Sequence, residues 1–273
     1  MLDSYSGATR VYFILGDPIA QVKAPAGLTG EFERRGRDAI VVPLQIAPAE
    51  IGAGIAALSR AANVDGLIAT IPHKFALVVH CATLSDRARF LGVANVARRN
   101  ADGSWHGDML DGEGFADAIA EAGCRFEGRR ALLIGAGGAG SAIALALLER
   151  GVATLAVHDS DPARRDALTG KLAAKFGDRI GPGADDPAHA DILVNATPRG
   201  MASDDPMPVD VSRLTAATFV GDVITVPEVT PLLQAARARG CLTQTGVGMF
   251  LSVLGRMAEF FEGPAWNNPR PSP

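Results

Sequence analysis

Short apolar runs alternate with longer amphipathic stretches along the chain. The short runs predict strands in the first half at residues 10–15, 39–44, 64–69, 93–98 and 104–107. The longer stretches predict helices at 28–35, 48–60, 74–79 and 111–122. In the second half, strands are expected at 131–134, 154–157, 191–195 and 218–223, and helices at 141–150, 162–176, 231–239 and 248–261. This alternation predicts an α/β fold.

The pattern also predicts two α/β domains with a cleft between them. We expect a first domain at residues 1–110 and a nucleotide-binding domain at 111–240. The last helix carries an apolar stripe of helical period, formed by Met249, Phe250, Val253, Leu254, Met257 and Phe260. We therefore expect residues 241–273 to pack back on the first domain.

A glycine-rich turn lies between the predicted strand at 131–134 and the helix that follows it. Gly135, Gly137 and Gly140 form a complete G-x-G-x-x-G, interrupted by Ala136, Gly138 and Ala139. In this context the first glycine allows a tight turn, the second lets the backbone approach a pyrophosphate, and the third lets helix and strand pack closely. The helix N-terminus offers unpaired N–H groups that suit a diphosphate. The motif predicts a Rossmann, doubly wound dinucleotide-binding domain.

Asp159 follows the next predicted strand and lies 19 residues after Gly140. That spacing is typical of the acidic residue that binds the ribose hydroxyls of NAD. A carboxylate there repels a 2′-phosphate, so the sequence favours NAD over NADP. The alternative is a helix N-cap or a surface turn at Asp159.

Composition narrows the class of protein. The 273 residues are 48% hydrophobic, enough for a substantial core, with a formal net charge of −4. With no block of lysine and arginine, we expect no nucleic-acid partner, and apolar runs such as 247–254 are too short to span a bilayer. Cys81, Cys124 and Cys241 are too scattered for a disulfide or metal framework, and the histidines lack metal-ligand spacing. We expect no metal and a cytoplasmic location.

Lys74 and Asp111 are the residues best suited to acid–base chemistry. Lys74 follows Pro72 at a predicted helix start, where a cation opposes the helix dipole and gives up its proton more readily. Asp111 stands where an N-cap would. From residue types alone, a surface lysine and an ordinary N-cap aspartate are the commoner explanation. His73, beside the lysine, is a second acid–base candidate or a helix-start hydrogen-bonder.

Several motifs, in this order, resemble the shikimate/quinate dehydrogenase family over nearly the whole chain. Of these, T-x-P-x-K and D-G-x-G-F are much more specific than the glycine turn. The six motifs are G-D-P-I-A at 16–20, T-I-P-H-K at 70–74, D-G-E-G-F at 111–115, the glycine turn at 135–140, N-A-T-P-R-G-M at 195–201 and T-P-L-L at 230–233.

The resemblance implies an N-terminal substrate-binding domain, a Rossmann NAD(P) domain and a C-terminal helix that closes on the former. It implies that Lys74 and Asp111 form the catalytic pair and that Thr70 and Asn95 contact substrate hydroxyls. On the cofactor side it implies a loop containing Asn195, Thr197 and Pro198, with Gly246 near the nicotinamide. It also implies aromatic amino acid biosynthesis as the context, and a homodimer is one assembly that it allows.

The chain departs from the family pattern at the carboxylate end of the substrate pocket. The S-x-S pair that holds the substrate carboxylate reads Val22-Lys23-Ala24 here. Further family polar positions are occupied by Ile68, Met109, Leu110, Thr225 and Val253. An apolar lining cannot satisfy a buried carboxylate. Either Lys23 compensates with its charge, or the substrate is less polar than shikimate.

On the cofactor side, the N-R-[ST] turn of NADP-using members reads His158-Asp159-Ser160, which resembles the NAD-preferring branch. Arg164 and Arg165 in the next helix are interpreted as a solvated face. We therefore expect an NAD-dependent dehydrogenase that oxidises a ring hydroxyl of a shikimate- or quinate-like hydroxy acid or polyol. The alternatives are a dehydrogenase of a different, less polar alcohol and a non-catalytic nucleotide-binding homologue.

Overall fold

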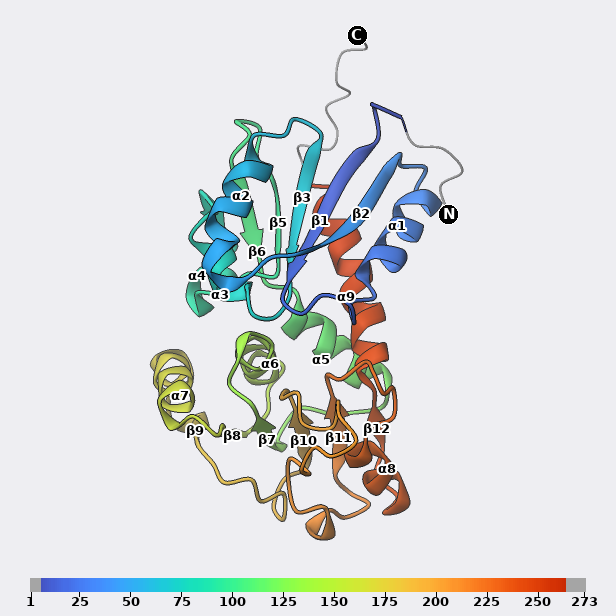
Figure 1. The fold of residues 1–273 in the computed structure, drawn as a ribbon. Coiled ribbons are helices and arrows are strands. Elements are labelled where there is room, and N and C mark those ends of the chain that lie inside the picture. Colours follow the sequence, from blue (N-terminus) through green and yellow to red (C-terminus); the bar gives the residue numbers. More distant parts are fainter. Residues whose placement is uncertain (1–5, 264–273) are drawn as a thin grey trace. The chain divides into compact units, whose positions relative to one another are not determined.

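The computed structural model describes residues 6–263, which divide into two compact units (Figure 1). The first contains the chain up to Leu110 together with residues from Leu254 on, and the second runs from Asp111 to Val253. The last helix, α9 (Gly246–Phe261), thus contributes its first half to the second unit and its second half to the first. Residues 264–273 of the expected C-terminal segment lie outside the described residues.

The first unit is built on a mixed six-stranded sheet in the order β2-β1-β3-β5-β6-β4. β1, β2 and β3 are parallel, β5 and β6 form an antiparallel hairpin, and β4 pairs parallel with β6. The strands are β1 (Arg10–Gly16), β2 (Ala39–Gln45), β3 (Val64–Ala69), β4 (Thr83–Leu84), β5 (Val96–Arg99) and β6 (Trp105–Asp108). The helices are α1 (Ala24–Arg34), α2 (Ile51–Ser59), α3 (Lys74–Val78) and α4 (Asp86–Leu91).

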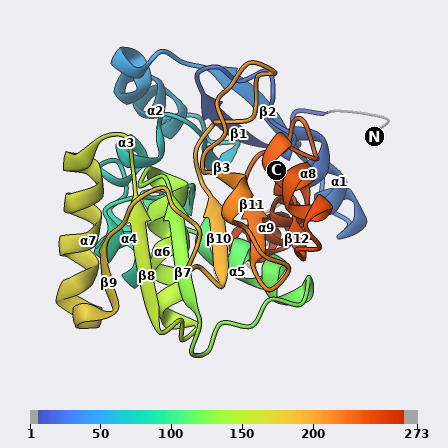
Figure 2. The ribbon, with the colours of Figure 1, turned by 90° about the horizontal axis from the view of Figure 1, so that it is seen from below.

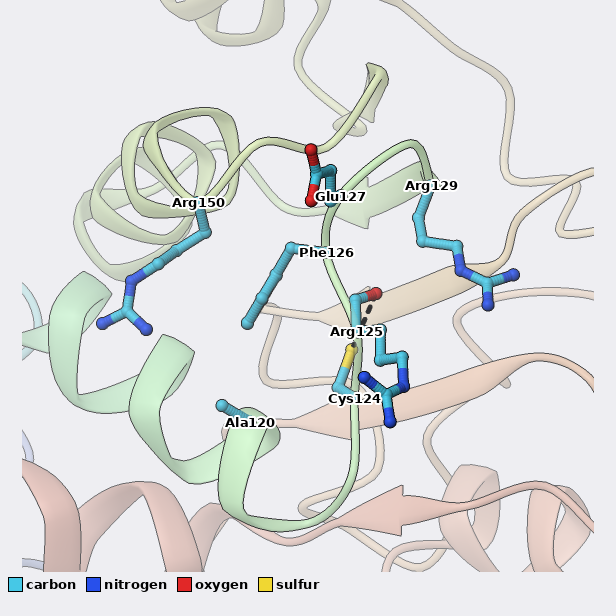
Figure 3. A pocket seen from close by; sticks show the side chains of 7 residues that line it. All are labelled: Ala120, Cys124, Arg125, Phe126, Glu127, Arg129 and Arg150. Carbon is cyan, nitrogen blue, oxygen red and sulfur yellow. Dashed lines mark hydrogen bonds between the residues drawn. The ribbon is translucent and has the colours of Figure 1, made fainter.

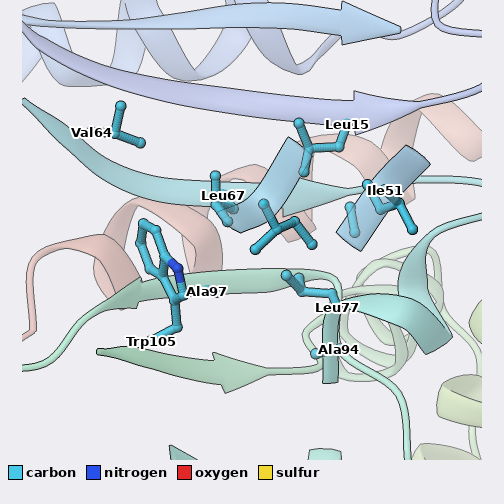
Figure 4. Packing of buried hydrophobic residues seen from close by; sticks show 10 residues of the cluster. Leu15, Ile51, Val64, Leu67, Leu77, Ala94, Ala97 and Trp105 are labelled. Carbon is cyan, nitrogen blue, oxygen red and sulfur yellow. The ribbon is translucent and has the colours of Figure 1, made fainter. Parts of the chain in front are cut away.

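Alternate residues of these strands build an apolar core on each face of the sheet. Tyr12 packs its ring against Phe32 of α1 and Phe261 of α9, with centroids 4.6 and 4.8 Å away. On the opposite face, Leu15 and Leu67 join a cluster with residues of α2 and α3, drawn in Figure 4. Both faces of the parallel strands are therefore covered. Because β1, β2 and β3 run in the same direction, their carboxyl ends lie at one common edge, where the loops that follow them gather.

The second unit is built on a parallel six-stranded sheet in the order β12-β11-β10-β7-β8-β9. Figure 2 shows these strands side by side, from β9 to β12. Numbered within the unit, this is the doubly wound order of the Rossmann fold, which reverses between β7 and β10. The strands are β7 (Arg130–Ile134), β8 (Thr154–His158), β9 (Ile180–Pro182), β10 (Ile192–Asn195), β11 (Phe219–Asp222) and β12 (Thr243–Gln244). The helices besides α9 are α5 (Asp111–Glu121), α6 (Gly138–Glu149), α7 (Pro162–Phe176) and α8 (Pro231–Ala238).

Two of the three cysteines are buried and Cys81 is half-buried, and all three are free thiols. Burial raises the pKa of Cys81 to about 11 and, as the main cause, that of Cys124 to about 12. They are therefore protonated at neutral pH and behave as small apolar side chains. Within residues 6–263 no helix is long and apolar enough to cross a membrane.

Candidate functional site

The glycine-rich turn joins β7 to α6 at the point where the strand order reverses. Ligands of doubly wound sheets bind at this point, beside the carboxyl ends of the strands. Gly135 has φ +105°, a value that L side chains rarely adopt. A Cβ on Gly140 would overlap the carbonyl oxygen of Gly135. Glycine at both positions is therefore required for α6 to begin directly against its strand.

Gly137 differs from Gly135 and Gly140, the other two glycines of the motif, in the space around it. It is the N-cap of α6, its backbone is extended, and a Cβ added to it would meet nothing within 4 Å. The space in front of the first turn of α6 is thus open, and the N–H groups of that turn are not used up inside the helix. This cradle fits a diphosphate, whose negative charge is favoured at a helix N-terminus.

Asp159 lies directly after β8 and is buried. Its Oδ2 accepts the N–H of Ala136 at 2.7 Å, and its Oδ1 accepts the N–H of Asp161 at 2.9 Å. The N-cap of α7 is Asp161, whose side chain accepts from Ala163 and Arg164, so Asp159 is neither that cap nor an exposed turn residue. Asp159 therefore ties the glycine turn to the end of β8, as well as standing at the spacing of a ribose-binding acid.

Arg164 is not simply part of a solvated face, which corrects the sequence interpretation. The Arg164 side chain is half-exposed, but its guanidinium lies 3.6 Å from Asp159 Oδ1 and 3.5 Å from Asp161 Oδ2. The first turn of α7 brings it back over the end of β8, where two carboxylates attract it. Arg165 is paired with its exposed neighbour Asp166.

The loop after β10 contains the residues that the resemblance implies for the cofactor side. The Asn195 side chain is fully buried and serves this loop: its Oδ1 accepts from the Thr197 N–H and hydroxyl at 3.1 and 2.7 Å, and its Nδ2 donates to the Arg199 carbonyl at 3.1 Å. Asn195 thus organises the loop, and Thr197 and Pro198 are its outer residues. That this loop binds a cofactor stays a prediction.

Asp222, which the sequence patterns do not single out, lies at the centre of the same edge. It ends β11 opposite Asn195 and is fully buried. Burial raises the pKa of Asp222, while hydrogen bonds from the Ile224 N–H, Thr230 and Asn195 act in the opposite direction. An acidic residue that ends a buried strand is the signal that could have indicated it. Gly246 begins α9 in the same unit, and a Cβ on it would overlap the Ile224 carbonyl.

The first unit holds the predicted substrate-side residues at the carboxyl edge of its parallel strands. Thr70 follows β3 and donates its N–H to the Leu15 carbonyl of β1 at 2.9 Å. Three residues later, His73 is buried, and its Nε2 donates to the Ile46 carbonyl at 2.8 Å. This anchor ties the turn to the end of β2, which supports the helix-start role of His73 over an acid–base role. Lys74, the next residue, begins α3 half-buried.

Asn95 and the residues before α1 complete this half. Asn95 is buried, and its Oδ1 accepts the N–H of Leu110, the residue before Asp111, at 2.9 Å. Val22 and Lys23 are half-buried, Ala24 is buried, and Lys23 is the N-cap of α1 without a side-chain cap bond. No hydroxyl stands at 22–24, so a carboxylate bound there would rely on Lys23 and on backbone N–H groups.

Asp111 is the first residue of α5 and is buried. It begins the second unit, whereas Lys74 belongs to the first. Their pairing across the two units, and with it the catalytic assignment, stays a prediction.

The described residues were also compared with two other kinds of site, a metal centre and a surface hollow. Among residues 6–263 no group of three or more His, Cys, Asp or Glu side chains is arranged to hold a metal ion. A hollow lined by the loop at 124–129, Ala120 and Arg150 lies before β7, at the amino end of the sheet (Figure 3). Its Arg150 is already paired with Asp117 at 2.5 Å and Glu113 at 3.3 Å. The hollow therefore contains none of the predicted site residues.

Comparison with known proteins places this arrangement in a family. The model of the shikimate dehydrogenase substrate binding domain matches residues 14–97. The shikimate dehydrogenase (NADP(+)) of Acidiphilium cryptum is 37% identical over 249 residues, which cover 90% of this chain and 88% of that protein. The chain belongs to the shikimate dehydrogenase family. The resemblance drawn from the sequence motifs is confirmed, as is the α/β fold with its Rossmann domain.

Solved structures that are similar to this chain carry names of more than one activity. Quinate dehydrogenase from Corynebacterium glutamicum in complex with NAD is 30% identical, covers 93% of this chain and 94% of its own, and has a TM-score of 0.83. The ligand-free 5-ketofructose reductase of a Gluconobacter strain is 26% identical, covers 93% of both chains, and has a TM-score of 0.82. These two proteins and the Acidiphilium relative are all named as oxidoreductases, and their names differ in cofactor or substrate.

The glycine turn provides a first test of the site. We expect Gly137→Ala to fold normally, since a Cβ there meets no atom within 4 Å, but to bind NADH at least about tenfold more weakly because the methyl group occupies the diphosphate cradle. Gly170→Ala is the matched control, because Gly170 in α7 is also open and lies outside the turn. Fluorescence titration with NADH and thermal unfolding would measure both. Equal NADH affinity in the two variants would contradict the cradle.

Proposed function

We propose that this chain is an NAD-dependent dehydrogenase that interconverts a ring secondary alcohol of a shikimate- or quinate-like compound and the corresponding ketone. The observation that supports it most is the Rossmann switch point, where an open glycine cradle and a buried acid after β8 stand at the required spacing. Family membership supports oxidoreductase chemistry. The retained Lys74 and Asp111 support turnover over a purely nucleotide-binding role.

In this mechanism the chain supplies binding, orientation and proton transfer. Residues 135–140 and the first turn of α6 hold the diphosphate, and Asp159 accepts hydrogen bonds from the ribose hydroxyls. A nicotinamide held there would supply hydride transfer between the cofactor and the alcohol carbon. Thr70 and Asn95 orient the substrate hydroxyls. The Lys74 Nζ takes the hydroxyl proton as the carbon is oxidised, and Asp111 positions Lys74 and shares that proton.

The proposed preference for NAD depends on charge at one position. The Asp159 carboxylate, already fixed by two backbone N–H groups, would face a 2′-phosphate with like charge. The family relative from Acidiphilium is described as NADP(+)-dependent, and the quinate dehydrogenase structure contains NAD, so both cofactors occur among relatives. The acid at 159 favours the second case here.

A second candidate substrate class is favoured by Val22 and Ala24. Without hydroxyl donors at these positions, the pocket suits a neutral, less polar alcohol or ketone better than a carboxylic acid. The similarity to 5-ketofructose reductase, whose name describes a neutral sugar ketone as its substrate, points in the same direction.

Removal of the Lys74 amine tests the proton-transfer role. We expect Lys74→Ala to lower kcat by about 10²- to 10⁴-fold, the usual contribution of a positioned acid–base group, with NADH affinity unchanged. Lys175→Ala is the control, because Lys175 forms an exposed ion pair with Glu149 on the outside of the second unit. Turnover by Lys74→Ala at the rate of the parent enzyme would remove Lys74 from the mechanism.

Reversal of charge at position 159 tests the cofactor assignment. We expect Asp159→Arg to lower the ratio of kcat/KM for NAD over NADP by about 10- to 100-fold, as expected for loss of a charge-assisted hydrogen bond and gain of a phosphate partner. Asp159→Asn separates the two effects, because it removes the charge, keeps an acceptor for the Ala136 N–H and leaves Arg164 in place. An unchanged ratio in both variants would reject the ribose role of Asp159.

Lys23→Gln decides between the two substrate classes. If Lys23 holds a substrate carboxylate, this variant should raise KM for quinate or shikimate about tenfold while kcat changes little. Steady-state kinetics on a panel of cyclic hydroxy acids and neutral polyols and sugar ketones, with NAD or NADH, would measure it. Turnover of neutral compounds alone, with no effect of Lys23→Gln, would favour the second class. NADH binding without turnover of any compound would instead indicate a non-catalytic homologue.

A further inference from the structure

Three buried polar side chains meet at the carboxyl edge of the Rossmann sheet. Asn195 ends β10, Asp222 ends β11, and Thr230 caps α8, and none of them is more than 1% exposed. The Thr230 hydroxyl donates to Asp222 Oδ2 at 2.8 Å, and Asn195 Nδ2 lies 3.3 Å from both carboxylate oxygens. Oδ1 also accepts the N–H of Ile224 at 3.0 Å. Asp222 is thus the common acceptor for three separate segments.

The first of these segments forms a wall of the glycine turn. Asn195, held by Asp222, binds residues 197 and 199 of its loop through its amide. That loop lies directly against Gly135, because a Cβ there would come within 2.9 Å of both the Ala196 carbonyl and the Thr197 methyl group. A shift of Asn195 therefore moves the backbone that contacts the start of the cradle.

The second segment leads from Asp222 to the first turn of α9. Ile224 donates its N–H to Asp222. The carbonyl of Ile224 lies so close to Gly246 that a Cβ on Gly246 would overlap it. The third segment is the start of α8, where the Thr230 hydroxyl also accepts the Leu233 N–H at 3.3 Å. One carboxylate thus links the glycine turn, the beginning of α9 and the beginning of α8.

The chemistry of position 222 requires a carboxylate rather than any polar group. The donors that converge on it are an amide, a hydroxyl and a backbone N–H, and they approach both oxygens. An amide in its place has one acceptor oxygen and would point an NH₂ group at one of these donors. Burial of an ionised carboxylate is costly unless hydrogen bonds compensate it, so its presence here is explained by the segments that it holds.

We infer that Asp222 is a positioning residue for cofactor binding, which fixes the loop at 195–199 and the segment at 223–226 around the nucleotide site without contacting the substrate. This inference rests on the proposed function for its link to the cofactor. The loop-holding role itself can be measured without any ligand.

The experiment compares Asp222→Asn with Asp210→Asn in the full-length protein. Asp210 is an exposed acid in the same unit whose side chain accepts the Ser212 N–H, so it controls for the loss of one charge. We expect Asp222→Asn to weaken NADH binding and raise KM for NAD about tenfold, with kcat at saturating NAD changed less than threefold. Amide hydrogen exchange should accelerate at 195–201 and 223–226, with the strands of the first unit unchanged.

A second pair of variants keeps the test decisive if Asp222→Asn does not fold. Thr230→Val removes the hydroxyl that donates to Asp222 and accepts the Leu233 N–H, and Thr230→Ser retains both bonds. Weaker NADH binding and faster exchange in the valine variant, restored in the serine variant, would support the inference. A valine variant that matches the serine variant in NADH affinity and in amide exchange would overturn the inference. A lower thermal stability of the valine variant without a selective change in NADH affinity would indicate a merely structural loss.

The outcomes separate this inference from the proposed function. If the parent protein binds no NADH, the proposed cofactor fails, and hydrogen exchange alone still decides whether Asp222 holds the two segments. If the parent protein binds NADH and Asp222→Asn binds it within twofold with unchanged exchange, the positioning role is wrong and the proposed function stands.

Discussion

The contact between Gly140 and the carbonyl of Gly135 is the constraint on which the nucleotide half of this protein depends. There is no room for a side chain at Gly140, so α6 can begin within a few residues of the end of β7. That close approach directs the first-turn N–H groups of α6 at the space in front of Gly137. Ala196 and Thr197, in the loop after the neighbouring strand β10, then pack against Gly135. The open cradle is the space that these three backbones leave.

Buried polar groups hold both sides of that cradle. On the β8 side, Asp159 accepts the Ala136 N–H, and on the β10 side, Asn195 and Asp222 hold the adjoining loop. Both devices use a carboxylate or amide at the end of a strand to bind backbone N–H groups that the sheet no longer pairs. In the first unit, His73 and Asn95 act similarly, since each binds a backbone group of a segment distant in the chain. Side-chain hydrogen bonds thus help to fix the loops at the edges of both sheets.

The sequence predicts those features that depend on local pattern. The parallel strands and the glycine turn follow from apolar runs and residue spacing, and the structure has them within a few residues. α4 is only six residues long, too short for a periodic pattern, although its Ser85 cap and Gly92 at φ +71° mark its two ends. The bond between Asn195 and Asp222 and the bond from the Ala136 N–H to Asp159 could not be predicted, because each joins segments that only the folded sheet brings together. The substrate likewise does not follow from Val22 and Ala24, which indicate what is missing rather than what binds.

In the proposed mechanism one amine and one carboxylate act together on the alcohol that is oxidised. A crystal structure with NAD and a bound substrate alcohol tests it most directly. We expect the Lys74 Nζ and an Asp111 carboxylate oxygen to lie within hydrogen-bonding distance of the same substrate hydroxyl, with the adjacent carbon facing the nicotinamide C4. A complex in which Lys74 and Asp111 lie on separate surfaces, or in which either points away from the nicotinamide, would contradict it.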